Sequence, residues 1–216
     1  MGTLMQVRQN DADAELEHAT DAAYFDALYA KTDDPWDMGG RWYEQRKRAL
    51  LDAILPKQRY ARAFEPGCGN GLFTELLAQR CDAVVASDLS DRAVHAAQER
   101  LRAHSHVTVS QGSLPADLPQ GKFDLIVVGE LGYYFDATTW MRVAHRLRAC
   151  LTRDGTLMAC HWKASFDARR LDTAFVHDAL RMTGDLHLQC LHDEPDFVVE
   201  LWTCGGQSLA TREGLR

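Results

Sequence analysis

The sequence predicts an α/β protein built on a three-layer, doubly wound sheet of seven strands, with an antiparallel hairpin at its C-terminal end and a helical cap at its N-terminal end. Three observations support this prediction. Strand-like and helix-like segments alternate from residue 58 onward, a glycine-rich turn follows the first strand, and the last two strand-like runs are neighbours in the chain. A chain of 216 residues suits a single domain, with a tail and cap over 1–57 and the α/β part over 58–216.

The N-terminal part predicts two helices after a polar start. Residues 1–18 are polar, and apolar side chains at helical spacing predict a helix over 19–30. A proline and two glycines within residues 31–40 interrupt that pattern. The next helix, over 41–55, carries its apolar residues on one side, with Lys47 among them. These helices are expected to cap the α/β part.

The α/β part predicts five strands separated by helices, and then a hairpin. The expected strands are 60–65, 83–88, 107–110, 123–129 and 156–162. The expected helices between them are 71–80, 91–103 and 137–151. Two further strand-like runs, 186–191 and 197–203, are joined by a short polar turn that contains Pro195, which is typical of an antiparallel hairpin.

Composition narrows the range of possible functions. The formal net charge of −7 disfavours nucleic acid as a partner, because phosphate contacts need clustered Lys and Arg. No run approaches the ~18 apolar residues of a membrane span, and the N-terminus lacks the basic-then-apolar pattern of a signal peptide. Six cysteines and nine histidines show no metal-ligand spacing. We therefore expect a cytoplasmic protein with reduced cysteines, no metal and no membrane partner, of open oligomeric state.

The turn after the first strand is the most informative segment. Glu65 precedes three glycines at alternate positions, Gly67, Gly69 and Gly71, and a helix begins directly after them. Glycine permits tight turns and close approach of a ligand, and free N–H groups at a helix start can hold an anionic group. The segment predicts a binding site for a cofactor that contains a nucleoside.

A second acid, Asp88, ends the strand at 83–88, roughly 20 residues beyond the turn, where a ribose-binding carboxylate belongs. Its alternative role is to cap the helix that starts near Asp91, although Ser90 could fill that role instead. The G-x-G-x-G spacing lacks the later glycine of the dinucleotide fingerprint. A nucleotide-dependent oxidoreductase of Rossmann type therefore remains only an alternative.

The glycine turn with Glu65 and Asp88 resembles the class I S-adenosylmethionine-dependent methyltransferases. Residues 123–135, which end in an acid followed by two tyrosines, are similar to the nodulation protein S family of that class, and so are residues 34–48 and 161–163. The resemblance implies a Rossmann-like fold, the cofactor S-adenosylmethionine, and methyl transfer to a small molecule or saccharide. An amine acceptor, such as a deacetylated amino sugar, is the first expectation, and O-methylation of a small metabolite is the alternative.

The resemblance also implies which residues hold the cofactor. Asp88 would bind the ribose hydroxyls, Leu89 would pack against the adenine, and the loop with Ser113 would reach the adenine edge, where relatives often carry Asp. Tyr43 and Arg46, three positions apart on one helix, are expected to face the methionine end of the cofactor. The full set of expected cofactor residues is Tyr43, Arg46, Glu65, Gly67, Gly69, Gly71, Asp88, Leu89, Ser113, Leu114 and Glu130.

Glu130 and His161 are the candidate catalytic residues. Glu130 follows a central strand, where open α/β sheets bind ligands, and His161 ends the neighbouring strand and titrates near neutral pH. Either side chain could accept a proton from an acceptor amine or orient it. Alternatively, Glu130 would bond a backbone turn and His161 would be a buried, hydrogen-bonded core residue.

Acceptor contacts are expected from Trp36, Tyr133, Tyr134 and His161. Aromatic side chains stack on the apolar faces of sugars or enclose a cationic sulfonium. One of the two tyrosines is expected to wall the pocket and the other to lie in the core, and the sequence does not distinguish them. Trp42, also in the cap, could close over the site in the same way; the alternative is that it packs the cap helices onto the sheet.

Overall fold

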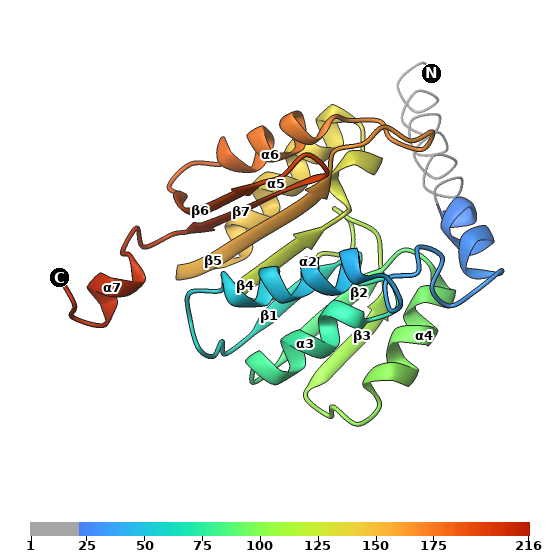
Figure 1. Ribbon diagram of the computed structural model, residues 1–216, viewed down its shortest axis with the longest axis horizontal. Coiled ribbons are helices and arrows are strands. Elements are labelled where there is room, and N and C mark those ends of the chain that lie inside the picture. Colours follow the sequence, from blue (N-terminus) through green and yellow to red (C-terminus); the bar gives the residue numbers. More distant parts are fainter. Residues whose placement is uncertain (1–21) are drawn as a thin grey trace, which may run out of the picture.

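The centre of the computed structural model, which describes residues 22–216, is one sheet with the strand order β3-β2-β1-β4-β5-β7-β6 (Figure 1). The first five strands are parallel, and β7 runs antiparallel to both β5 and β6. The predicted doubly wound sheet with a terminal hairpin is therefore confirmed. The strands are β1 (Ala63–Pro66), β2 (Val84–Asp88), β3 (Val107–Gln111), β4 (Phe123–Gly129), β5 (Leu151–Trp162), β6 (His187–Asp193) and β7 (Phe197–Thr203).

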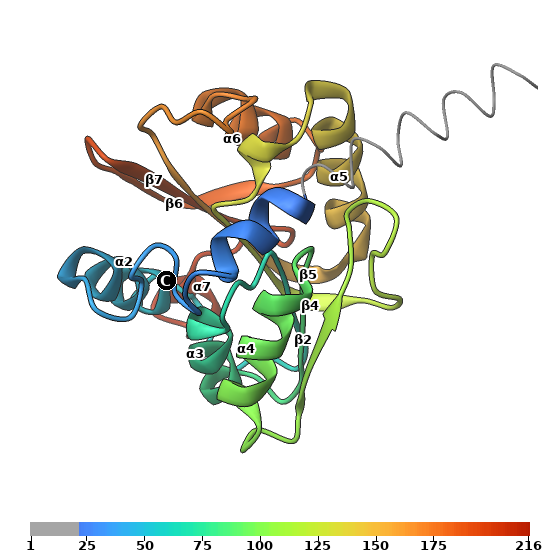
Figure 2. The ribbon, with the colours of Figure 1, turned by 90° about the vertical axis from the view of Figure 1, so that its right-hand side faces the viewer.

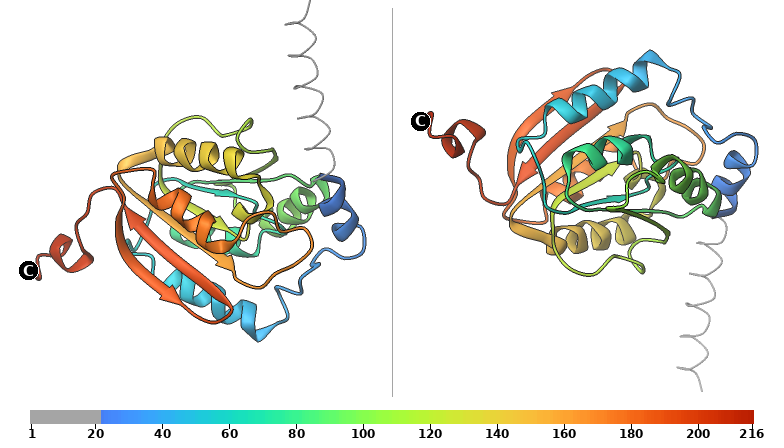
Figure 3. Two further views of the ribbon diagram at one scale, coloured as in Figure 1. Left: turned by 90° about the horizontal axis from the view of Figure 1, so that it is seen from above. Right: turned by 90° about the horizontal axis from the view of Figure 1, so that it is seen from below.

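Helices cover both faces of this sheet, as the two views of Figure 3 show. One face carries α2 (Trp42–Ala53), α3 (Leu72–Arg80) and α4 (Asp91–Leu101). The other face carries α5 (Ala137–Cys150) and α6 (Thr173–Arg181). A short 3₁₀ helix, η1 (Gly132–Tyr134), follows β4, and α7 (Leu209–Arg212) lies near the C-terminus. The arrangement is the three-layer architecture that the sequence predicts.

The apolar core is divided by the sheet into two halves. Because successive strand residues face opposite sides, Leu125 and Val127 of β4 pack with the α2 and α3 face, whereas Ile126 and Val128 pack with the α5 and α6 face. All four side chains are at most 1% exposed. Burial on both faces explains why β4 reads as a continuous apolar run in the sequence.

The structure differs from the sequence prediction most at β5 and α6; in addition, β1 begins at Ala63 instead of residue 60, and the short helices η1 and α7 were not predicted. β5 begins at Leu151 instead of residue 156, because an irregular register between β4 and β5 lets the polar residues before Gly155 continue the strand. Helix α6 was missed, although Asp172 caps it by accepting a hydrogen bond from the N–H of Phe175 at 2.7 Å. The prediction for residues 1–18 falls outside the described part of the chain.

The two N-terminal helices have different positions. Residues 22–29 are helical and lie across the carboxyl ends of the parallel strands (Figure 2). Helix α2 instead packs along the sheet, and Leu51 and Leu55 belong to the apolar core of that face. Only the first of the two helices therefore covers the strand ends, where ligands of open α/β sheets bind. The division of the chain at residue 57 stays a prediction.

Candidate active site

The glycine turn (residues 67–71) connects β1 to α3 with three backbone conformations that suit glycine. Gly67, Gly69 and Gly71 have φ values of 71°, 54° and 78°. At Gly71, which caps α3, a Cβ atom would lie 3.1 Å from Cβ of Ala97 and 3.2 Å from its Cα. Glycine is thus needed at this position both for the backbone conformation and for the close packing of α3 on α4.

Asp88 lies at the rim of this turn. Its Oδ2 accepts a hydrogen bond from the N–H of Gly69 at 2.8 Å, and its Oδ1 accepts one from the N–H of Ser90 at 3.0 Å. Burial raises the pKa of Asp88, and these N–H donors oppose the rise. The hydroxyl of Ser90 caps α4 by accepting from the N–H of Ala93. The capping role that was the alternative for Asp88 is therefore filled by its neighbour.

Glu65 lies beneath the turn instead of beside it. Its side chain is buried, and its Oε2 accepts a hydrogen bond from the hydroxyl of Thr74 at 2.6 Å. Burial raises the pKa of Glu65 to about 8; the bond from Thr74 opposes the rise and the charge of Asp88 adds to it. Glu65 therefore supports the turn from the strand side, and its role toward a cofactor stays a prediction.

The loop after β3 lies next to Asp88 and Leu89. Gly112 donates its N–H to the carbonyl of Asp88, and the side chain of Gln111 donates to the carbonyl of Leu89, both at 3.0 Å. In the same loop the N–H of Ser113 donates to Asp117 at 2.9 Å. Leu114 is buried beside it. The loop is thus placed at the same rim as Asp88, and Asp117 supplies a carboxylate there that sequence reasoning missed.

Glu130 follows β4 in a left-handed backbone conformation with φ of 52°, which is uncommon for a residue with a side chain and often marks functional sites. Its Oε2 accepts hydrogen bonds from the hydroxyl of Tyr133 at 2.6 Å and from the N–H of Trp162 at 2.8 Å. Its Oε1 lies 2.8 Å from Nζ of Lys47. The side chain remains 31% exposed, so this well-oriented carboxylate is still within reach of a ligand.

Lys47 was not predicted as a site residue. Its side chain is 8% exposed, and Nζ pairs with Glu44 at 3.0 Å as well as with Glu130. Burial alone would lower the pKa of Lys47, but the two carboxylates outweigh it, so the pKa is raised and the ammonium group stays charged. A lysine on the apolar side of a predicted helix was the one signal in the sequence that could have revealed it.

Tyr43 lies on the same side of α2 as Lys47. Its ring packs edge-on against Phe197, with centroids 6.0 Å apart. Its hydroxyl is buried and has no hydrogen-bond partner in the described part of the chain. Burial raises the pKa of Tyr43 to about 12, so the hydroxyl keeps its proton. The structure therefore places Tyr43 near the carboxylates of Glu44 and Glu130, and its predicted contact with the cofactor stays a prediction.

The structure corrects the expected role of His161. The side chain is fully buried, and both ring nitrogens have protein partners: Nε2 accepts from the N–H of Gly132, and Nδ1 lies 3.0 Å from Nε2 of His177. Burial, with the neighbouring His177, lowers the pKa of His161 well below its ordinary value. A neutral, saturated, buried imidazole cannot accept a proton from an acceptor or touch it, so the buried-core alternative is the right one.

His161 instead begins a chain of buried hydrogen bonds. Because Nε2 of His161 accepts from Gly132, its proton lies on Nδ1 and is donated to His177. His177 in turn donates from Nδ1 to Glu200 at 2.9 Å, and Glu200 pairs with Arg181 at 2.5 Å. This chain fixes the start of η1, and with it the loop that carries Tyr133 beside Glu130.

The two tyrosines of η1 have different environments. Tyr133 is 3% exposed and belongs to the core, with its hydroxyl directed at Glu130. Tyr134 is partly buried, and its ring lies 4.9 Å from that of Phe25, in the helix that covers the strand ends. Tyr134 is therefore the candidate for the pocket wall, and Tyr133 is the core residue that orients Glu130.

The structure pairs Arg46 with the turn between β6 and β7. Its guanidinium forms two hydrogen bonds, at 3.0 Å and 2.6 Å, with the carboxylate of Glu194 in the β6–β7 turn. In this structure the guanidinium is therefore paired with Glu194, and its predicted contact with a cofactor carboxylate stays a prediction. Trp36 is 38% exposed and packs edge-on against Tyr29, whereas Trp42 is 74% exposed and does not pack on the sheet.

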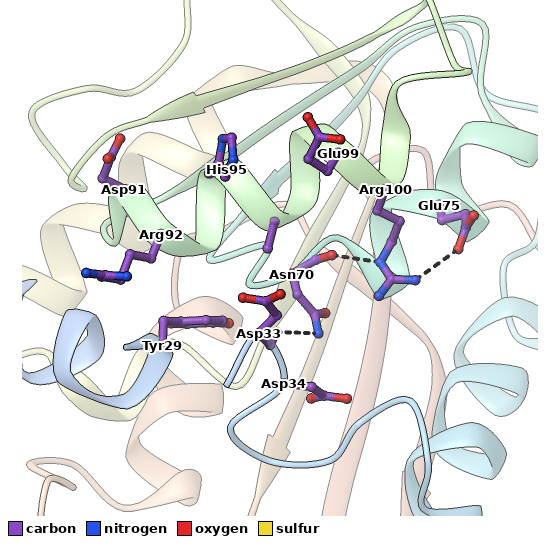
Figure 4. A pocket seen from close by; sticks show the side chains of 11 residues that line it. Tyr29, Asp33, Asp34, Asn70, Glu75, Asp91, Arg92, His95, Glu99 and Arg100 are labelled. Atoms are coloured by element: carbon purple, nitrogen blue, oxygen red, sulfur yellow. Dashed lines mark hydrogen bonds and ion pairs between the residues drawn. The ribbon is translucent and has the colours of Figure 1, made fainter. Parts of the chain in front are cut away.

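The segment from residue 22 to residue 34, here called the roof segment, covers the glycine turn. Asp26 accepts a hydrogen bond from the hydroxyl of Ser90 at 2.5 Å, and the side-chain amide of Asn70 donates to the carbonyl of Asp33 at 3.1 Å. Between the roof segment and α4 lies a cavity of about 840 Å³ (Figure 4). None of the expected cofactor residues lines this cavity, which meets the glycine turn at Asn70. Its lining residues are Tyr29, Asp33, Asp34, Asn70, Glu75, Asp91, Arg92, His95, Ala96, Glu99 and Arg100.

The residues present suit a nucleoside cofactor with a positive charge. The glycine turn leaves its backbone open to close approach, and Asp88 provides a carboxylate beside it. The buried hydroxyl of Tyr29, which lies against Gly69, and that of Tyr43 on α2 lack a partner within residues 22–216. Buried polar atoms without partners are the groups that a bound ligand can satisfy. Among these residues no group of three or more His, Cys, Asp or Glu is placed to hold a metal ion.

Two further findings concern the described residues as a whole. No helix within residues 22–216 combines the length and the apolar character needed to cross a membrane. All six cysteines are free thiols.

The chain is similar to proteins of one family. The model of nodulation protein S (NodS) matches residues 26–170. Nodulation protein S of Sinorhizobium fredii is 31% identical over 128 residues, 58% of this chain and 59% of that protein. Nodulation protein S of Rhizobium tropici is 33% identical over 113 residues, 52% of this chain and 48% of that protein. The chain thus spans about half to three fifths of the length of these curated relatives.

Two solved structures share the fold. A presumed methyltransferase from Pseudomonas syringae is 44% identical, with a TM-score of 0.68, and the match covers 76% of this chain and 99% of that one. The N-methyltransferase NodS from Bradyrhizobium japonicum WM9, in complex with S-adenosyl-L-homocysteine, has a TM-score of 0.74 over 84% of this chain and 97% of that one. At 24% identity this second likeness concerns the fold.

Proposed function

This chain belongs to the nodulation protein S family, and from that premise we propose that it transfers a methyl group from S-adenosylmethionine to an amine of a small molecule or saccharide. The observation that carries the proposal is the placement of Asp88 and Glu130 at the carboxyl ends of β2 and β4, on either side of β1 and its glycine turn. One carboxylate suits a ribose and the other suits an acceptor, at the edge of the sheet where such folds bind ligands.

The cofactor is proposed to lie along the glycine turn. When bound, S-adenosylmethionine supplies an electrophilic methyl group on a sulfonium. Asp88 would hold the ribose, while Leu89 and the loop of Ser113 and Leu114 would contact the adenine. The turn contributes close backbone approach, and the nearby carboxylates favour a ligand with positive charge. Family membership and the fit of these residues support this assignment.

The acceptor is proposed to approach Glu130. In the transfer a bond forms between the acceptor nitrogen and the methyl carbon, while the bond between that carbon and sulfur breaks and its electron pair stays on sulfur. The nitrogen must attack as a neutral amine, so an acceptor that arrives as an ammonium ion first gives up a proton. Glu130 can accept a hydrogen bond from the amine and help to remove that proton, since its carboxylate is partly exposed.

The neighbours of Glu130 prepare it for this role. Lys47, Tyr133 and the N–H of Trp162 all donate to its carboxylate, so the side chain is held in one orientation before an acceptor arrives. Such preorganisation is worth several kcal/mol of the barrier when it fixes a nucleophile at near-attack distance. Partly saturated by three donors, Glu130 is better suited to orient an amine than to act as a strong base.

The choice of acceptor class rests on two observations. An amine is favoured because the N-methyltransferase NodS from Bradyrhizobium japonicum shares the fold. A saccharide is favoured because aromatic side chains such as Tyr134 and Trp36 border the roof segment. A nucleic-acid acceptor is disfavoured by the net charge of −7. We also propose a cytoplasmic location, where S-adenosylmethionine is available.

The proposal is tested by a methyl-transfer screen with glucosamine oligomers, simple amines and hydroxylated aromatic compounds, read out by mass spectrometry of the products. We expect methylation at nitrogen that depends on S-adenosylmethionine. Methylation at oxygen would move the protein to the alternative acceptor class. Stabilisation by NADH, with no response to S-adenosylhomocysteine, would instead support the oxidoreductase alternative.

A further inference from the structure

Tyr29 carries a buried hydroxyl group that the protein itself leaves without a partner. The residue is 4% exposed, and its oxygen has no hydrogen bond within residues 22–216. An unpaired buried hydroxyl destabilises the fold, because it loses its hydrogen bonds to water without gaining others, and its presence in a folded protein needs an explanation. In an ordinary core position a phenylalanine would be the more stable residue.

The position of this hydroxyl is specific. A Cβ atom on Gly69 would lie 2.9 Å from Oη of Tyr29, so the hydroxyl rests directly on the middle of the glycine turn. Burial raises the pKa of Tyr29, and the charge of the neighbouring Asp88 adds to the rise. The hydroxyl therefore keeps its proton and lies against the turn, near the carboxylate that is proposed to hold the ribose.

A second unpaired atom lies nearby. Asn70 is 2% exposed, and its Oδ1 has no partner in the described structure, although its Nδ2 donates to the carbonyl of Asp33. Tyr29 and Asn70 line the same cavity, and Figure 4 shows the ring of Tyr29 extending toward the side chains of Asp33 and Asn70. One unpaired polar atom comes from the roof segment and one from the glycine turn. A ligand between them would supply the partners that both lack.

We propose that Tyr29 is a cofactor-binding residue whose hydroxyl group hydrogen-bonds the nucleoside of S-adenosylmethionine beside Asp88. The inference rests on the proposed function, because it names a further ligand of the same site. The nucleoside offers ribose hydroxyls and ring nitrogens that can complete the bonding of a phenol. The roof segment thus contributes a hydrogen bond that exists only with the cofactor present.

The substitution Tyr29→Phe separates this role from a structural one, because the two roles predict opposite signs. Without ligand, removal of an unpaired buried hydroxyl leaves the melting temperature unchanged or raises it. With ligand, the lost hydrogen bond weakens binding of S-adenosylhomocysteine by about 3- to 10-fold. A tyrosine that merely held the fold together would lose melting temperature in the unliganded protein.

The experiment uses isothermal titration calorimetry and thermal unfolding on the full chain. Tyr24→Phe is the matched control, since Tyr24 belongs to the same helix and is 43% exposed. Two ligands distinguish the ends of the cofactor: S-adenosylhomocysteine, and 5′-methylthioadenosine, which lacks the amino-acid part. We expect Tyr29→Phe to weaken both by a similar factor and Tyr24→Phe to weaken neither.

Three results would overturn the inference. The first is that Tyr29→Phe binds both ligands as tightly as the wild type. The second is a loss of affinity for S-adenosylhomocysteine alone, which would put the hydroxyl at the amino-acid end of the cofactor. The third is a lowered melting temperature of Tyr29→Phe without ligand. A folded wild-type protein that binds neither ligand would count against the proposed function itself.

Discussion

The ammonium nitrogen of Lys47 lies 2.8 Å from Oε1 of Glu130 and joins α2 to the end of β4 across 83 residues of the chain. Glu44 holds the same ammonium from the other side. The pair holds Glu130 in one orientation at the strand end, where an acceptor amine is proposed to bind. Glu44, Lys47 and Glu130 together, more than any one of them, mark the side of the site that we propose for the acceptor.

We expect Lys47→Met to lower the free energy of unfolding by about 1–3 kcal/mol, less than the roughly 3–5 kcal/mol of a fully buried pair, since Glu130 is partly exposed. Acceptor kcat/KM should fall at least about 10-fold, while the Kd of S-adenosylhomocysteine stays within about 2-fold, because Lys47 acts on Glu130 and not on the glycine turn. Steady-state kinetics and calorimetry test both statements. The control is Arg41→Met at the N-terminal end of the same helix, whose exposed pair with Asp37 should matter for neither. Equal kinetics in the two variants would remove Lys47 from the site.

The tight packing at Gly71 can be separated from its backbone strain. Gly71 and Gly184 both have positive φ, 78° and 82°, but a Cβ at Gly184 would have open space around it, whereas one at Gly71 would meet Ala97. We expect Gly184→Ala to cost about 1–2 kcal/mol through strain alone and Gly71→Ala to cost at least about 1 kcal/mol more. Urea unfolding of the two variants measures the difference, and equal costs would show that α4 yields without penalty.

The lowered pKa of His161 predicts that the free energy of unfolding depends on pH. Its pKa in the folded protein is far below the ordinary value of 6.5, so below pH 6.5 the unfolded chain binds a proton that the folded protein does not. Stability therefore falls as the pH drops below 6.5, by up to about 1.4 kcal/mol per pH unit. We expect His161→Gln to flatten this slope and the exposed His95→Gln to leave it unchanged. A slope that survives in His161→Gln would mean that another group causes it.

Glu65 predicts a trend of the opposite sign. Its pKa is raised from 4.5 to about 8 in the folded protein, so between these values the folded state holds a proton that the unfolded chain releases. Its contribution to stability is complete below pH 4.5 and is lost as the pH rises toward 8. Replacement by glutamine, which mimics the protonated acid, should remove this loss, whereas Glu75→Gln on α3 should not. Unfolding curves measured from about pH 4 to about pH 9, a range that brackets the pKa values of Glu65 in the unfolded and folded states, test this prediction.

The parts of the fold that follow local patterns were predictable from the sequence. β4 and β7 have the predicted bounds, because central strands buried on both faces leave continuous apolar runs. The glycine turn, and Ser90 as the helix cap beside Asp88, followed from backbone conformation and capping chemistry. Helix α6 was missed although Asp172 at its cap and an apolar face indicate it. The loop before it has no glycine or proline to mark where the helix begins.

The parts that depend on distant pairs were not predictable. Arg46 was assigned to the cofactor from its spacing to Tyr43, yet its partner, Glu194, is 148 residues away. His161 looked like a titrating group because the sequence does not show that His177 and Gly132 saturate its ring. In each case the residue type was noticed, and tertiary packing decided which atom it meets.

The measurement that tests the central claim most directly is a calorimetric titration of S-adenosylhomocysteine into the wild-type chain and into Asp88→Ala. We expect one binding site per chain in the wild type and at least about 10-fold weaker binding in the variant, because the ribose hydroxyls lose their carboxylate partner. The matched control Asp82→Ala, an exposed residue just before β2 and at the other end of that strand from Asp88, should bind like the wild type. A well-folded wild-type protein that shows no binding would contradict the account, and so would an Asp88→Ala variant that binds as tightly as the wild type.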